Sequence, residues 1–511
     1  MNEDCSRNES CTRTKYTYDA LNRLTKITYS DSTPTVTDCY DGSNSSCISG
    51  GYSSSNGEGR RTAMSDGSGS TGWSYDAMGR TVTEKRTIAG ITKTISYSYN
   101  EDGSIASITY PSGRVVSYSV GNAERALSAT DSNGSQYAVT ASYAPMGALS
   151  TVIYGKVTGG FNGITESRQY NNRLETTSIA ASSSNGTAMN LAPCFTSFSL
   201  STGCSSTSTG NNGSVTGIIN GVDTGETQDF TYDNLNRILS AATKATSGND
   251  CWGQSFGPDA VANLTSIGVS QCTAGWLSVT TDGYNHLSAT GYSYDAAGDM
   301  TSDGSYTYTY DAENRITSAN GVTYTYDGND LRVEKSSGTL YWRSITGDVL
   351  AESDLQGNIT NEYVFFAGRR IARISSGTVN YFYSDAAGTV HTITDATGNA
   401  CYDASFTPYG QEVLNPNISP TCSSNYKFAG YEYDSETGLY YAKARYYNPR
   451  LGRFMSTDPL GGDPGNPQSL NQYVSTSLKG IHFRRFAGGP GSRAASSEHT
   501  HAPAAAKSKQ S

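Results

Sequence analysis

The chain has 511 residues and few charged ones, 36 Lys and Arg against 46 Asp and Glu, which gives a net charge of −10 at pH 7. At about 150 residues per domain, this length would allow three or four domains. The acidic balance argues against a nucleic-acid-binding face on the main body. The 37 Tyr residues favour β-strands.

Targeting signals are missing from the sequence. The first residues lack the apolar stretch of a secretory signal, and no apolar run approaches the ~18 residues of a membrane span. The longest apolar cluster runs from Tyr363 to Ala367. We therefore expect no transmembrane segment, and we interpret residues 1–13 as the N-terminal segment of a truncated or upstream-continued chain.

A short motif recurs along residues 14–360. It reads Tyr-x-Tyr-Asp-x-x-Asn/Gly followed by Arg, and its second Tyr steps by 16 residues from Tyr294 to Tyr310 to Tyr326. Alternate Tyr residues lie on one face of a strand, Asp and Asn or Gly supply a turn, and Arg restarts the next strand. Each unit therefore predicts a β-hairpin, and roughly a dozen such units tile the chain.

We expect the repeat side chains to be structural rather than catalytic. Stacked hairpins would align the Tyr rows and place each Arg over an aromatic ring or beside a repeat Asp. Residues 181–217 are rich in Ser, Thr and Gly and predict long loops or enlarged hairpins. The residues assigned this structural role are Tyr18, Asp19, Arg23, Tyr75, Asp76, Arg80, Tyr232, Asp233, Arg237, Tyr294, Asp295, Tyr310, Asp311, Arg315, Tyr326 and Asp327.

The 10 cysteines fall into neighbouring pairs, as hairpin-tip disulfides would. The alternative is reduced thiols, because spacing alone does not fix connectivity. No pair has the C-x-x-C spacing of zinc or redox sites, and the His residues are scattered, so we expect no metal and no cofactor. The candidate pairs are Cys5 and Cys11, Cys39 and Cys47, Cys194 and Cys204, Cys251 and Cys272, and Cys401 and Cys422.

Residues 361–475 depart from the simple repeat and resemble the core segment of the Rhs (rearrangement hotspot), or YD-repeat, family. Together with the repeats, the resemblance covers about residues 14–475. The residues that match the core signature are Gly430, Asp434, Gly438, Leu439, Tyr440, Tyr441, Arg445, Tyr446, Tyr447, Pro449, Gly452, Arg453, Phe454, Asp458, Pro459 and Gly461.

The resemblance implies an all-β fold: a strip of YD-repeat hairpins that winds into a hollow shell, closed or incomplete, with the core segment turned inward as a plug. In bacterial members the shell encloses a variable C-terminal toxin, which an intramolecular aspartyl protease cuts from the core. The implied partners are an encapsulated toxin polypeptide in full-length relatives and a secretion system or upstream shell modules. The implied location is secreted or at the cell surface.

The implied protease needs two carboxylates, one ionised and one protonated. Asp458, in Asp458-Pro459-Leu-Gly461, matches the first, and no second Asp-Pro follows at the family's spacing. Residues 476–511 are basic, with Glu498 as their one acid, and predict a disordered tail in place of the toxin. Either a frameshifted or truncated gene or a very short effector would explain that tail.

The leading hypothesis is therefore a structural encapsulation and delivery protein of the Rhs polymorphic-toxin type without a functional toxin, in which Asp458 is one half of a protease. Two alternatives remain open. The Tyr-rich surface could bind glycans as an adhesin, since aromatic faces stack on sugars. The chain could also be a working autoprotease whose second carboxylate comes from Asp463 or Asp434.

Overall fold

The computed structural model describes residues 12–42, 45–49, 51–121, 123–205, 210–272, 274–415, 417–418, 421–459 and 470–474. Nearly all regular structure in them is antiparallel β-sheet, as the repeat predicts, and strands adjacent in sequence pair with each other. The pairing gives a 21-stranded sheet, a 12-stranded sheet, a 4-stranded sheet and two small hairpins. Residues Cys5, Cys11 and Gly461, and the tail at 476–511, lie outside the described residues.

The first part of the strip is the 21-stranded sheet together with the small hairpin β16–β17. Its strands are β1 (Thr14–Tyr18), β2 (Leu24–Tyr29), β3 (Val36–Tyr40), β4 (Arg61–Asp66), β5 (Gly69–Tyr75), β6 (Thr81–Ile88), β7 (Ile91–Tyr99), β8 (Ile105–Thr109), β9 (Val115–Val120), β10 (Ala126–Asp131), β11 (Gln136–Tyr143), β12 (Leu149–Tyr154), β13 (Ile164–Tyr170), β14 (Thr176–Ser183), β15 (Gly186–Cys194), β16 (Phe198–Ser199), β17 (Gly203–Cys204), β18 (Gly217–Asn220), β19 (Gln228–Tyr232), β20 (Ile238–Thr243), β21 (Trp252–Pro258), β22 (Leu264–Cys272) and β23 (Leu277–Ser278).

The strip continues through one hairpin, the 12-stranded sheet and the 4-stranded sheet, and two short 3-10 helices, η1 (Thr224–Glu226) and η2 (Phe428–Gly430), lie in its connections. These strands are β24 (Tyr292–Tyr294), β25 (Met300–Asp303), β26 (Tyr308–Tyr310), β27 (Ile316–Ala319), β28 (Val322–Tyr326), β29 (Arg332–Lys335), β30 (Thr339–Arg343), β31 (Val349–Ser353), β32 (Ile359–Phe366), β33 (Arg369–Ser375), β34 (Thr378–Ser384), β35 (Val390–Thr394), β36 (Ala400–Phe406), β37 (Glu412–Leu414), β38 (Glu432–Asp434), β39 (Leu439–Tyr441), β40 (Tyr446–Asn448) and β41 (Arg453–Phe454).

The repeat turns share one geometry, which the Asp side chain holds. Asp19 Oδ1 accepts hydrogen bonds from the backbone N–H groups of Leu21 and Arg23, both at 2.9 Å, and Asp19 Oδ2 accepts from Arg23 Nε at 2.7 Å. Asn22 takes the left-handed conformation, with φ of 59°, which Asn tolerates better than most residues. The same three side-chain contacts recur at the turns of Asp76, Asp233 and Asp311.

In several repeats the hydroxyl of the second Tyr links one hairpin to the preceding one. Tyr99 donates its hydroxyl hydrogen to the carbonyl of Thr81 at 2.7 Å, and the Arg80 guanidinium lies 4.7 Å from the centre of its ring. Equivalent hydroxyl bonds run from Tyr75, Tyr232, Tyr310 and Tyr326 to carbonyls of the preceding hairpin. The Tyr, Asp and Arg side chains therefore make contacts of a structural kind.

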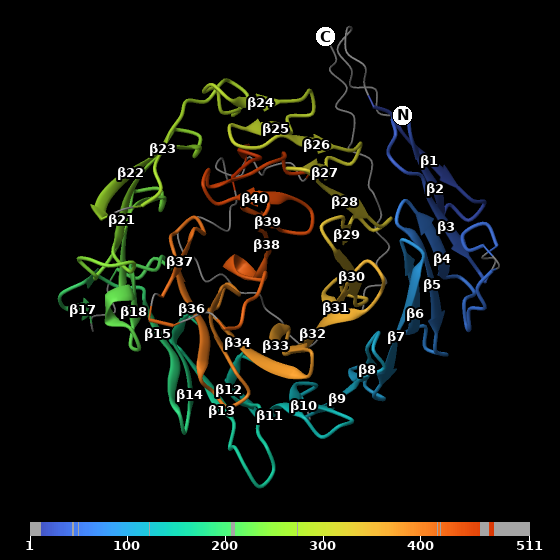
Figure 1. The fold of residues 1–511 in the computed structure, drawn as a ribbon, viewed down its shortest axis with the longest axis horizontal. Helices are drawn as coiled ribbons and strands as arrows, with labels where there is room; N and C mark the ends of the chain where they lie inside the picture. Colours follow the sequence, from blue (N-terminus) through green and yellow to red (C-terminus); the bar gives the residue numbers. More distant parts are fainter. Residues whose placement is uncertain are drawn as a thin grey trace.

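The strip winds as a spiral (Figure 1). Strands β1–β25 run round the outside, β26–β37 continue inside them, and β38–β41 lie at the centre. We call these parts the outer turn, the inner turn and the core unit. Contacts between the two turns join residues 279 apart at Thr33 and Ala312, but only 212 apart at Asn185 and Thr397. The inner turn therefore covers the same arc with fewer residues than the outer turn, so the spiral narrows.

The spiral is packed in layers of apolar side chains. One cluster joins outer-turn residues such as Val152 and Ile179 to inner-turn residues such as Val364 and Ile371. Another joins the opposite side of the inner turn to the segment that precedes the core unit, where Tyr426 is buried. Strand β31 is consequently buried along its whole length, whereas β1 is mostly exposed. Within the described residues, no helix is long and apolar enough to cross a membrane.

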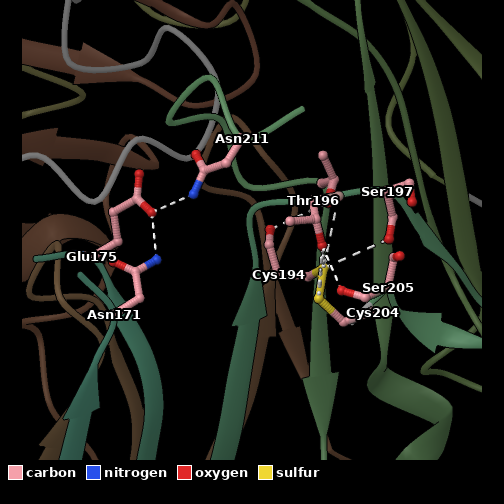
Figure 2. The surroundings of a disulfide bond; sticks show 9 residues. Asn171, Glu175, Cys194, Thr196, Ser197, Cys204, Ser205 and Asn211 are labelled. Atoms are coloured by element: carbon pink, nitrogen blue, oxygen red, sulfur yellow. Dashed lines mark hydrogen bonds between the residues drawn. A yellow bond between two sulfur atoms is a disulfide. The ribbon is translucent and has the colours of Figure 1, made fainter. Parts of the chain in front are cut away.

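The described part of the Ser- and Gly-rich residues 181–217 forms an enlarged hairpin rather than a plain loop. Strands β14 and β15 pair across a tight turn, and the excursion that follows β15 is closed by a disulfide between Cys194 and Cys204. Figure 2 shows this disulfide, with the Thr196 hydroxyl donating to the Ser205 carbonyl at 2.9 Å. The other described disulfides join Cys39 to Cys47, Cys251 to Cys272 and Cys401 to Cys422, which are the neighbouring pairs.

Candidate functional site

The core motif is anchored to the inner turn by buried charges. Arg332, at the start of β29 and fully buried, contacts both oxygens of Asp434 at 2.5 and 3.0 Å and lies 2.9 Å from Glu432. Lys335, on the same strand, contacts Asp434 at 2.9 Å and Glu436 at 2.9 Å. We call this set the β29–β38 ion cluster; its members are Arg332, Lys335, Glu432, Asp434 and Glu436.

The aromatic residues of the motif complete this cluster. The Tyr441 hydroxyl accepts the backbone N–H of Arg332, and the Arg332 guanidinium lies 4.3 Å from the centre of the Tyr441 ring. The Tyr446 hydroxyl lies 3.0 Å from Arg332 Nη1. Burial alone would lower the pKa of Arg332, but Asp434 and Glu432 raise it well above its ordinary value. The arginine is therefore held as a cation, and the motif's Tyr and Asp residues seat the core unit against β29.

The remaining motif residues shape the core unit. Leu439, Tyr440 and Tyr447 are buried in β39 and β40, and Phe454 packs edge-on to Tyr447. Gly452 has a φ of 63°, and a Cβ there would lie 2.7 Å from the Tyr409 ring, so this turn requires glycine. Gly430 and Gly438 also take positive φ, and Pro449 follows β40.

Asp458 lies at the end of the described part of the core segment. Its carboxylate contacts Arg445 Nη2 at 2.7 Å, and its backbone N–H donates to the carbonyl of Gln472 at 3.0 Å. Arg445 Nη1 donates to the same carbonyl, and its guanidinium lies 3.8 Å from the centre of the Phe454 ring. The guanidinium of Arg453, the residue before Phe454, lies 4.4 Å from the centre of the Tyr473 ring. Residues 453–459 and 470–474 are therefore held together around Asp458.

The hydrogen bonding does not fit Asp434 as the second carboxylate of a protease. Both Asp434 oxygens are taken by Arg332, and one also by Lys335, so Asp434 is committed to the β29–β38 ion cluster. Asp458 instead pairs with Arg445. Asp463 lies outside the described residues.

A buried carboxyl group that the sequence analysis did not single out lies beside the same segment. Asp299 is fully buried, and neither of its carboxyl oxygens has a hydrogen-bond partner among the described residues. Burial, with help from Asp295 and Asp311, raises its pKa to about 8. The next residue, Met300, donates its backbone N–H to the carbonyl of Met455 at 2.8 Å. Asp299 occupies the position at which other repeats have Arg. This break in the motif is the sequence signal by which the residue could have been found.

One edge of the outer turn exposes apolar side chains at a repeated position. In each case the residue lies two after the turn Asp and donates its backbone N–H to that Asp, so the side chain projects from the turn. Leu21 is 71% exposed, Met78 78% and Tyr284 78%. We call this set the turn row; its members are Leu21, Met78, Leu235, Val261 and Tyr284.

The opposite edge of the outer turn is covered by matching turns of the inner turn. The Asp311 turn donates the N–H of Ala312 to the Thr33 hydroxyl at 2.9 Å. The Asp327 turn donates the N–H of Gly328 to the Asp66 carboxylate at 2.8 Å. The Asp-turn edge of the inner turn therefore fits the far edge of the outer turn. The turn row lies on the Asp-turn edge of the outer turn, where the core segment contacts the backbone of the Val261 and Tyr284 turns through Asn471 and Arg453.

Known proteins share parts of this sequence. Residues 366–477 match the family model described as the teneurin YD-shell. The tRNA nuclease WapA of Bacillus subtilis strain 168 is 31% identical over 196 residues, which are 36% of this chain and 8% of WapA. The toxin protein Tse5 of Pseudomonas aeruginosa PAO1 is 32% identical over 98 residues, 19% of this chain and 7% of Tse5.

Solved structures share the fold of most of the chain. The crystal structure of TcdB2-TccC3 superposes with a TM-score of 0.71 at 16% identity and covers 92% of this chain and 27% of the other. The Photorhabdus luminescens Tc holotoxin pore superposes with a TM-score of 0.70 at 15% identity over 93% of this chain and 26% of the other. The chain thus spans about a quarter of the matched chains and less than a tenth of the two sequence relatives.

Proposed function

This chain is a YD-repeat shell protein with a core segment of the Rhs type, and on that premise we propose that it forms the narrowing end of a larger encapsulating shell. The nested turns and the seated core unit would make one end of the container. The turn row would be the edge on which a preceding turn of YD-repeat strip is stacked. That preceding turn could come from the same polypeptide or from a partner chain.

The turn row is the observation that carries this proposal. Soluble proteins rarely expose several large apolar side chains along one edge unless another surface covers them. The inner turn shows how such a cover is built, because its Asp311 and Asp327 turns already rest on the far edge of the outer turn. A preceding strip that offers its own far edge would cover Leu21, Met78 and Tyr284 in the same way.

Sedimentation velocity tests the proposal on the chain alone. An uncovered docking edge should drive concentration-dependent association, and replacing Leu21, Met78 and Tyr284 together by Ser should leave a monomer. A matched control replaces three exposed apolar residues outside the row, Val157, Val269 and Leu414, by Ser. Association of the row variant equal to that of the wild type, or a wild type that stays monomeric at every concentration, would refute the docking edge.

We also propose that the chain serves toxin delivery as container rather than as catalyst. The names of WapA and Tse5 associate this type of core with nuclease and toxin proteins, and Asp458 forms an ion pair with Arg445. Intact mass spectrometry of the fresh chain should give the full 54.2 kDa. The mass of a fragment cleaved shortly after Tyr473 would instead establish an autoprotease, provided that the Asp458→Asn variant has the full-length mass.

A secreted or cell-surface location fits the disulfides. The described cysteines are all paired, and disulfides persist in oxidising compartments. The non-reduced chain should therefore weigh less than the reduced chain by two hydrogens for each bridge, and equal masses would place the chain in a reducing compartment.

Carbohydrate binding is the second candidate function, and exposed aromatic rings favour it. Trp276 and Tyr284 are 75% and 78% exposed. Glycan-array binding that is lost in Trp276→Ala would support an adhesin, and a silent array would remove that function.

A further inference from the structure

Residues 470–474, which we call the strap, lie against the last hairpins of the outer turn. The Asn471 amide donates from Nδ2 to Asn263 Oδ1 at 2.7 Å, and the Tyr473 hydroxyl donates to the carbonyl of Gly298 at 2.6 Å. Asn471 and Tyr473 are both buried. The strap is therefore packed into this part of the outer turn rather than laid over its surface.

The strap also holds the end of the core motif. The backbone N–H of Phe454 donates to the carbonyl of Tyr473 at 2.9 Å, and the backbone N–H of Asp458 donates to the carbonyl of Gln472 at 3.0 Å. Any movement of the strap away from the outer turn would therefore loosen the backbone on both sides of the core motif's last residues.

The hairpin turns beneath the strap lack the repeat arginine. The position four residues after the turn Asp holds Asn263, His286 and Asp299 instead. Asn263 accepts the hydrogen bond from Asn471, and the His286 ring packs edge-on to the Tyr473 ring at 5.9 Å between centres. Asp299 has no hydrogen-bond partner for either carboxyl oxygen among the described residues. An acid thus lies unpaired where the repeat places a cation.

The backbone on both sides of Asp299 carries the contact with the core segment. The Gly298 carbonyl accepts the Tyr473 hydroxyl, and the Met300 N–H donates to the carbonyl of Met455 at 2.8 Å. Asp299 itself is fully buried. Its carboxyl group can reach water only if this backbone moves, and such a movement would break the bonds that seat the strap.

No described cation pairs with Asp299. Arg315, the arginine of the next hairpin, pairs with Asp311 at 2.6 Å and with Asp330 at 2.8 Å. Burial, Asp295 and Asp311 raise the pKa of Asp299 to about 8. The titratable groups that face Asp299 are Asp295 in its own turn, Tyr310 and Asp311 in the next hairpin, and Tyr473 in the strap.

His286 and Arg453 are the basic groups on the other side of the strap. His286 Nδ1 lies 3.3 Å from Asp282 Oδ2, and the Arg453 guanidinium lies 4.4 Å from the centre of the Tyr473 ring. Because histidines titrate in the same pH range, a test of Asp299 must separate its effect from that of His286.

We propose that protonation of Asp299 keeps the strap seated and that its ionisation releases the strap. A buried carboxylate without a cation carries a large desolvation cost, which hydration would relieve. The turn that carries Asp299 becomes hydrated by moving away from the strap, and this movement would uncover the core motif around Asp458. The proposal concerns the core segment and does not depend on docking at the turn row.

The pH dependence follows from proton linkage. The seated state holds a proton on Asp299 that the released state loses, because a hydrated Asp299 returns toward its ordinary pKa. The equilibrium constant for release should therefore rise by up to tenfold per pH unit between about pH 4 and about pH 8, and level off above that.

Hydrogen exchange of the full chain at about pH 5.5 and about pH 7.5 tests the proposal. After correction for intrinsic exchange rates, protection of the Phe454 and Asp458 amides should fall at least tenfold between the two pH values. Strands β39 and β40 should keep their protection, which separates release of the strap from unfolding of the core unit.

Two variants remove the charge while keeping the shape of the side chain. In Asp299→Asn and in Asp299→Leu the Phe454 and Asp458 amides should be equally protected at both pH values. Leu has no polar atom to hydrate, so it covers the case in which the Asn variant fails to fold, as thermal unfolding will show. The control Asp102→Asn, at an exposed acid, should behave as the wild type.

Three results would overturn the proposal. Equal protection of the wild type at both pH values would show that the charge of Asp299 does not act on the strap. A fall that persists in both Asp299 variants would assign the pH dependence to another group, and His286→Gln would show whether that group is His286. Loss of protection in β39 and β40 together with the strap would mean that the core unit unfolds as a whole.

Discussion

The inner turn and the outer turn are built from the same repeat but use it differently. The inner turn includes strands that are buried along their whole length, such as β31, and its charges, such as Arg332, are compensated inside the protein. The outer turn is covered on one face only, and its repeat ion pairs, such as Arg23 with Asp19, remain partly exposed. One local motif thus supports two environments, and the identity of a few side chains decides which environment each hairpin can occupy.

The largest expected difference between the two turns lies in their arginines. Arg332→Met should cost about 3–5 kcal/mol of stability, because it leaves Asp434 and Glu432 buried without a cation. The same change at a repeat arginine of the outer turn, Arg23→Met, should cost about 1 kcal/mol or less. Thermal and urea unfolding of both variants measure the loss in the free energy of unfolding. Equal losses would show that the β29–β38 ion cluster does not anchor the core unit.

Two disulfides allow a comparison at equal loop length. Cys401–Cys422 in the inner turn and Cys251–Cys272 in the outer turn each join residues 21 apart. Replacing either pair by Ala should cost about 3 kcal/mol from chain entropy. The inner pair should cost more, because Cys401 and Cys422 also belong to a buried apolar cluster. A smaller loss for the inner pair than for the outer pair would contradict this ranking.

Asp299 predicts a pH dependence. Its pKa of about 8 lies well above the ordinary value, so the folded chain holds a proton that the unfolded chain has released, and stability falls as pH rises from about 4 to about 8. Asp299→Asn should flatten this fall in melting temperature. The part due to Glu226, whose pKa burial and nearby acids raise to about 8, should remain. The control Asp102→Asn removes an exposed carboxylate whose pKa Ser104 lowers. A slope unchanged in Asp299→Asn would mean that this carboxyl is ionised at neutral pH.

The smallest stability effect is expected at the turn row. Single replacements such as Met78→Ser alter a side chain that is 78% exposed and should change stability by no more than about 0.5 kcal/mol. A larger loss in the melting experiment would indicate that the row supports the fold of the chain itself rather than docking.

The hairpins and the all-β fold follow from local signals. Asp19 and Arg23 are four residues apart, Asn22 accepts positive φ, and alternate Tyr residues share a face, so each turn is specified within a few residues. The core motif was equally visible, because its Gly, Tyr and Asp spacing is distinctive. The family resemblance supplied the shell, which periodicity alone did not predict.

The nesting of the turns could not be predicted from the same signals. Contacts such as Thr33 with Ala312 join residues 279 apart that carry no shared motif. The partner of Asp434 was hidden for the same reason. Arg332 lies five residues after Asp327, one place beyond the position of the repeat arginines, and no local signal links it to Asp434. Asp299, by contrast, could have been noticed as an acid in the place of a repeat arginine.

Hydrogen exchange of the chain at low and high concentration tests the central claim most directly. The account predicts that association slows exchange at the turns that carry Leu21, Met78 and Tyr284 and leaves β31–β36 unchanged, because those strands are already buried. Protection that appears elsewhere on the outer turn, with the turn row still exchanging freely, would contradict the claim that this edge receives the preceding turn of a shell.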